Sequence, residues 1–168
     1  PWQRYKSTIT AVKVADEGIA PVSTELWFSG FKQMTSCDVG KLDTSNVTNM
    51  SSMFGGCSSL KELDLSSFDT SNVTGMYYMF AGCKSLKTLD VSALDTHRVT
   101  DMTAMFAGCS SLESLNLANL DTSKVSGMYG MFQGCSSLKS LDLSSFDTSN
   151  VKTMSNMFLN CSSLTTVN

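Results

Sequence analysis

Apolar residues recur along this chain in two rhythms that follow one another. Five of them are spaced by three or four positions, as on one face of a short helix: Val47, Met50, Met53, Phe54 and Cys57. The apolar residues that come next step by two positions, as on a strand with one buried face: Leu63 and Leu65. The pattern therefore predicts a short helix, a turn and a short strand.

The same unit returns every 26 residues. One cysteine marks each copy: Cys57, Cys83, Cys109, Cys135 and Cys161. An Asp-Thr pair recurs at the same interval from Asp43 to Asp147, and ten of the eleven methionines fall in two columns of the repeat. A fixed period of this length indicates a solenoid whose coils stack on one another.

Residues 1–41 are interpreted as an N-terminal cap with a degenerate first coil, and residues 42–168 as tandem 26-residue repeats, the last one incomplete. In the degenerate coil, Trp27, Phe28 and Phe31 stand where later coils place Met, Phe and Cys, and residues 9–14 alternate as a strand does. The predicted fold class is an α/β solenoid: a right-handed leucine-rich-repeat-like stack of about five to six coils, each a short parallel strand, a turn and a short helix, with an atypical N-terminal capping coil.

Two further columns predict the ends of each short helix. Hydroxyl side chains are suited to cap its first turn: Thr48, Thr74, Thr100 and Ser126. Residues that tolerate the left-handed conformation stand where it should stop: Gly56, Gly82, Gly108, Gly134 and Asn160.

Composition excludes several classes of function. The net charge is -3 with only 16% charged residues, so we expect no nucleic-acid partner. The longest apolar runs, such as residues 26–28, are too short to cross a bilayer, so we expect no membrane insertion of this segment. The chain starts at Pro1 and ends inside a predicted strand. We therefore expect an excised or processed segment of a longer array, or self-association end to end at the uncapped C-terminal coil.

Units such as LKELDLSSFDTSNVTGMYYMFAGC, residues 60–83, resemble the BspA-like leucine-rich-repeat surface proteins of bacteria. The form DTSNVTNMSSMF is similar to their methionine- and phenylalanine-bearing subgroup, which is also found in mycoplasma surface proteins. The resemblance implies a secreted or cell-surface bacterial protein that adheres to host or bacterial surface proteins. It implies no catalytic residues.

The columns of methionine and cysteine, called the sulfur columns below, have two interpretations. Thioethers and thiolates suit soft metal ions such as Cu(I), but Met and Cys are also adaptable core fillers. The degenerate coil favours the core, because Phe31 occupies a Cys slot there while Cys37 occupies a Leu slot. Shape is therefore what these positions require, and we expect no metal and no cofactor. The cysteines are expected to be free buried thiols, because cysteines of one column point the same way rather than toward one another.

The Asp column has a structural explanation as well. Asp43 and its equivalents precede Thr and usually Ser, which favours a bond from a backbone amide two residues on over a calcium site. His97 is the single histidine and replaces a Ser in such a turn, so it is expected to be exposed. Because no hydrolytic or redox constellation is present, we expect that the protein is not an enzyme.

We expect the functional residues at exposed positions whose side chains differ from one repeat to the next. Neighbouring exposed columns place Tyr77, Tyr78 and Tyr129 on one side, and exposed tyrosines are common binding anchors. A turn column places the cations Arg98 and Lys124 in adjacent coils. These five residues are the candidate partner-binding residues.

Three hypotheses follow. The first is a non-enzymatic protein-binding or adhesion module of a bacterial cell-surface or secreted protein. The second is a structural stalk or scaffold that displays another domain and has no ligand of its own. The third is a metal or redox module built on the sulfur columns.

Overall fold

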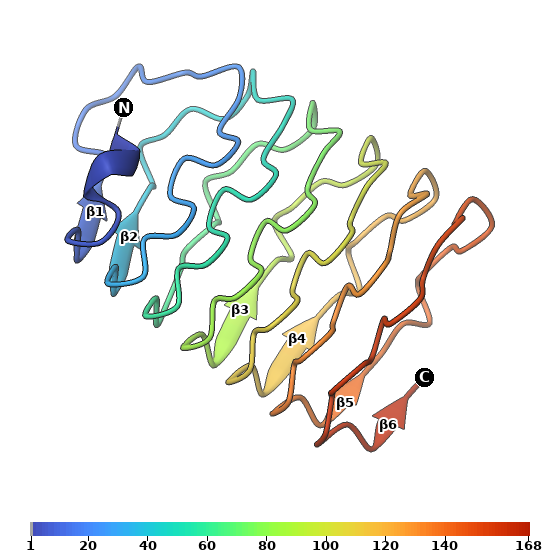
Figure 1. The fold of residues 1–168 in the computed structure, drawn as a ribbon. Helices are drawn as coiled ribbons and strands as arrows, with labels where there is room; N and C mark the ends of the chain where they lie inside the picture. Colours follow the sequence, from blue (N-terminus) through green and yellow to red (C-terminus); the bar gives the residue numbers. More distant parts are fainter. Residues whose placement is uncertain (1) are drawn as a thin grey trace.

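A computed structural model describes residues 2–168. The chain winds into coils that lie side by side, with the N-terminus at one end of the stack and the C-terminus at the other (Figure 1). A 3-10 helix, η1 (Trp2–Tyr5), precedes six short strands: β1 (Ala11–Lys13), β2 (Ser36–Asp38), β3 (Thr88–Asp90), β4 (Ser114–Asn116), β5 (Ser140–Leu141) and β6 (Thr166–Val167). Residue 1 of the expected cap lies outside the described residues.

The strands pair in parallel between neighbouring coils, as the repeat predicts, but the strand predicted at Leu63 and Leu65 is not formed in that coil. β1 pairs with β2, β3 with β4 and β5 with β6, each in register one coil apart, for example Leu89 opposite Leu115. The predicted strand at residues 9–14 is present in shortened form as β1. Parallel strands joined by a whole coil are the expected connection in a solenoid.

The predicted short helices are wrong: η1 is the only helix in the part of the chain that the structure describes. Alternate amides of each segment, such as those of Ser52 and Phe54, donate to carbonyls of the next coil, at Tyr77 and Met79, both at 2.9 Å. The amides between them bond three residues back, as in consecutive turns. An isolated helix of two turns is marginal in water, whereas these bonds satisfy the amides between coils.

The predicted N-caps are wrong for the same reason. The Thr74 hydroxyl donates to the backbone oxygen of Thr48 at 3.2 Å, and the Thr100 hydroxyl donates to that of Thr74 at 3.3 Å. These hydroxyls therefore bond between coils instead of capping a helix. The left-handed conformation predicted for the stop column is confirmed, because Gly56 has a φ of 75° and Asn160 a φ of 61°, but it ends a run of turns and not a helix. A side chain at Gly56 would also lie 3.4 Å from the Cα of Gly30 in the preceding coil.

The inward side of each coil forms one continuous core. The Val, Met, Phe and Cys columns predicted to face inward are buried in the central coils. Six phenylalanine rings lie one above another with centroids 5.6–6.0 Å apart: Phe28, Phe54, Phe80, Phe106, Phe132 and Phe158. The degenerate coil takes part, since Phe31 and Met34 are also buried. The last coil is more open, and Met154, Leu159 and Val167 are each 45% exposed there.

Candidate functional site

The sulfur columns lie in the core and have partners within it. Each column thiol donates to the carbonyl of a phenylalanine 29 residues earlier, as Cys57 does to Phe28 at 3.1 Å. All six cysteines are free, five of them buried and Cys161 half-buried. Burial raises the pKa of Cys57 to about 12, so its thiol stays protonated and unreactive. Across residues 2–168, no three His, Cys, Asp or Glu side chains are grouped to hold a metal ion.

The Asp column forms the predicted turns. The carboxylate of Asp69 accepts the amide of Ser71 at 3.0 Å and its hydroxyl at 2.6 Å. These bonds lower the pKa of Asp69, the side-chain bond most and the backbone bond next. His97 is exposed in the equivalent turn, with its Nδ1 at 2.7 Å from Asp95 Oδ1. The turn interpretation of this column is confirmed.

The two candidate cations lie in these turns, in adjacent coils. Arg98 donates to the side-chain oxygen of Asn72 at 3.2 Å. The pKa of Asp121 is lowered mainly by bonds from Ser123, and the charge of Lys124 adds a smaller effect. Both cations are exposed.

We call residues 49–55 and their equivalents in the other coils the turn face; these are residues 23–29, 75–81, 101–107, 127–133 and 153–159. Tyr77 and Tyr78 contact each other there, edge to face, with centroids 6.0 Å apart. The Tyr77 hydroxyl donates to Glu25 at 2.8 Å, two coils back. Its side chain thereby crosses the intervening coil at Ser51, which is fully buried. The bond to Glu25 is the main cause of a raised pKa for Tyr77, to which burial, the charge of Glu25 and the charge of Asp101 also contribute.

Tyr129 lies two coils beyond this pair, and its hydroxyl accepts from the side-chain amide of Asn156 at 2.7 Å. Tyr77 and Tyr129 therefore bond toward opposite ends of the solenoid. The structure brings Tyr77 and Tyr78 together and leaves Tyr129 apart from them. Tyr78 is 43% and Tyr129 38% exposed, so part of each residue is open to solvent.

Sequence reasoning missed a carboxylate that lies in the coil between Tyr78 and Tyr129. Asp101 is half-buried, and its Oδ1 accepts the amide of Thr103 at 2.8 Å. Its neighbours in the adjacent coils are Gly75 and Gly127, which have no side chains to cover it. The column Asn49, Gly75, Asp101, Gly127 was the available signal, since it sets one carboxylate between two glycines.

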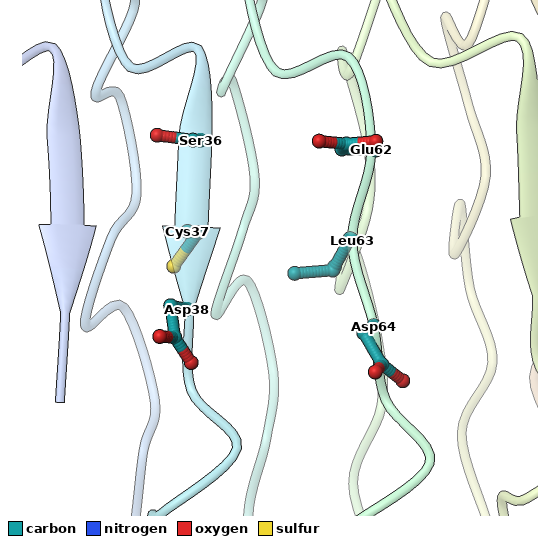
Figure 2. Close-up of a pocket in the computed structure, with 6 residues that line it drawn as sticks. All are labelled: Ser36, Cys37, Asp38, Glu62, Leu63 and Asp64. Atoms are coloured by element: carbon teal, nitrogen blue, oxygen red, sulfur yellow. The ribbon is translucent and has the colours of Figure 1, made fainter.

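Shallow hollows lie on the strand side, which is the face formed by the strands and the equivalent residues of the other coils. One, of about 360 Å³, lies between β2 and residues 62–64, and Figure 2 shows Cys37 and Leu63 in its middle with carboxylates on both sides. Those of Asp38 and Asp64 already accept backbone amides, at 3.3 and 2.9 Å. Another, of about 450 Å³, is lined by Lys61, Ser85, Lys87 and Ser111. Cations therefore border the strand side, whereas the turn face has none.

The model of a family described as "Mycoplasma protein of unknown function, DUF285" matches residues 23–114 and 84–167. No curated protein matches the sequence. No helix in the described residues is long and apolar enough to cross a membrane.

Two solved structures are similar. A leucine-rich repeat protein from Bacteroides ovatus aligns over 95% of this chain with a TM-score of 0.61 and 23% identity, which confirms the leucine-rich-repeat fold. The chain spans 37% of that protein's length. A leucine-rich cell surface protein from Faecalibacterium prausnitzii aligns over 96% of this chain and 73% of its own length, with a TM-score of 0.27 and 14% identity.

Proposed function

The chain belongs to the DUF285 family of mycoplasma proteins, and we propose that it is a non-enzymatic module of a bacterial cell-surface or secreted protein that binds other proteins. The leucine-rich-repeat fold supports this role, because an extended stack of coils presents a long, continuous surface for recognition. Its partner is proposed to be a host or bacterial surface protein, bound outside the cell.

One observation carries the proposal: the buried positions of each coil stay nearly constant, whereas the exposed positions of the turn face vary from coil to coil. The slot that holds Ser51 in one coil holds Tyr77 and Tyr129 in others, and the next slot holds Ser52 or Tyr78. Large aromatic side chains left exposed on a rigid frame are typical anchors of protein interfaces. A stalk without a ligand has no need of them.

The proposed role needs no catalysis. The single histidine is exposed in a turn with Asp95, and the five column thiols donate to core carbonyls. These groups therefore have structural tasks in the repeat. Self-association through the last coil stays a separate prediction, in which Met154, Leu159 and Val167 would become buried, and sedimentation over a range of concentrations measures it.

Flow cytometry with the fluorescently labelled chain tests the proposal on bacterial and mammalian cells. We expect binding that protease treatment of the cells removes, and a loss of about tenfold or more in the variant Tyr77→Ser/Tyr78→Ser/Tyr129→Ser. Serine already occupies these slots in other coils, so the variant should fold.

The matched control is Lys61→Ser/Lys87→Ser/Lys139→Ser on the strand side, which should bind as the wild type does. A wild-type chain that binds no cells would favour the stalk. Equal binding by the tyrosine variant would refute the role of the tyrosines.

A further inference from the structure

The turn face has a one-sided distribution of charge. None of the 12 lysines and arginines lies on it in any coil, whereas Glu25 and Asp101 do. Glu25 is engaged by Tyr77. Across residues 2–168 the ion pairs involve Glu17, Asp38 and Asp95, so Asp101 has no cationic partner of its own.

Asp101 lies in the coil between the two exposed tyrosines. The amide of Tyr78 donates to the carbonyl of Thr103 at 2.9 Å, and the amide of Ala104 donates to that of Tyr129 at 2.8 Å. One coil therefore separates the backbone of Tyr78 from that of Tyr129 along the stack, and this coil carries the carboxylate. The Asp101 Oδ1 leans over Gly127, since a Cβ built there would lie only 2.7 Å from it.

We infer that Tyr78, Asp101 and Tyr129 form a site for a cationic side chain of the partner, an arginine or lysine presented by a basic segment of a protein. The carboxylate supplies the charge, and the tyrosine ring faces attract the same cation. The planar guanidinium of arginine fits best, because it stacks on an aromatic ring while it donates to a carboxylate. This inference rests on the proposed function and names the chemistry that the partner must offer.

Hydrogen bonds of the backbone preorganise this site before a partner binds. The bond from the Thr103 amide holds the Asp101 side chain in place, and coil-to-coil bonds hold the segments of both tyrosines. Gly75 and Gly127, its neighbours in the adjacent coils, place no side chain over the carboxylate. A partner would therefore lose little free energy to the ordering of this surface.

A titration of the isotope-labelled chain with N-acetyl-arginine amide, followed by amide chemical shifts, tests the inference. The control ligand is N-acetyl-citrulline amide, which has the same shape without the charge. We expect the largest shifts at Tyr78, Asp101, Thr103 and Tyr129, and binding of citrulline about tenfold weaker.

Two variants sharpen the test. Asp101→Asn should weaken arginine binding about tenfold and still fold, because Asn49 occupies this slot in another coil and accepts the Ser51 amide in the same way, at 2.9 Å. Asp90→Asn, on the strand side, should bind arginine as the wild type does. No arginine binding, equal binding of citrulline, or shifts spread equally over the strand-side aspartates would each overturn the inference.

The outcomes for this inference and for the proposed function are separable. If the chain binds cells but not arginine, the cationic site is wrong and the binding module stands. If it binds arginine at the turn face but no cells, the site stands and the proposed function fails.

Discussion

Replacement of Phe80 by alanine should destabilise the solenoid strongly. The ring is fully buried and lies between Phe54 at 5.9 Å and Phe106 at 5.7 Å, nearly parallel to both. A buried Phe→Ala change costs about 3–5 kcal/mol, and we expect the upper part of that range because two ring contacts are lost. Since about 1 kcal/mol shifts the melting temperature of a chain of this size by 2–4 °C, Tm should fall by roughly 10–15 °C.

The same change at Phe158 should cost about half as much, because this ring is half-buried and stacks only on Phe132 at 6.0 Å. Thermal unfolding followed by circular dichroism measures both variants. Phe80→Leu is the matched control: it keeps most of the apolar volume and should cost only about 1–2 kcal/mol. Equal costs at the two positions would refute the reasoning, because a continuous stack must lose more at its middle than at its end.

Three further predictions follow from other parts of the molecule. Alkylation of the folded chain at pH 8 should modify the half-buried Cys161 first and the five buried thiols only after denaturation. Under denaturing conditions without reductant, six modified cysteines would show that all are free thiols. Fewer than six would reveal disulfide bridges. Gly127→Ala places a Cβ 2.7 Å from Asp101 Oδ1 and should lower the free energy of unfolding in urea by about 1–3 kcal/mol. Gly40→Ala is the control: the nearest atom to its Cβ is 3.6 Å away, so it should cost less than about 0.5 kcal/mol. Equal costs would contradict the geometry. Hydrogen bonds from residues two positions on lower the pKa of eight turn aspartates below 3.8, so their contribution to stability is present above that pH and is lost as the pH falls through the folded pKa values. Tm should therefore be constant from about pH 7 to 5 and decline below about pH 4. A steep decline of Tm above pH 5 would contradict this origin.

The repeat and its inward columns could be predicted from the sequence, because core positions recur with little change. Phe31 of the degenerate coil stands where later coils have Cys, which indicates that these positions require an apolar side chain of suitable shape. Both the phenylalanine and the cysteines of the central coils are buried. The turns at Asp69 and its equivalents were predictable too, because their bonds are local.

The short helices were not predictable as turns from spacing alone. Steps of three and four place Met50, Met53 and Phe54 on one side of a helix, but consecutive turns do the same. What decides between them is the amide of Ser52, which bonds to Tyr77 in the next coil, and such a bond between coils leaves no local signal.

The tyrosine columns were found, but the directions of the side chains were not. Tyr77 turns toward Glu25 and Tyr129 toward Asn156, and both partners lie in other coils at variable positions. Asp101 was overlooked because a single carboxylate in a column of small residues has no periodic signal.

Photo-crosslinking on the cell surface tests most directly the claim that recognition takes place on the turn face. A photoreactive benzoyl-phenylalanine replaces Tyr78 in one variant and Lys87, on the strand side, in another. We predict a covalent adduct with a cell-surface protein from position 78 and none from position 87. An adduct of equal or greater yield from position 87 would contradict the account.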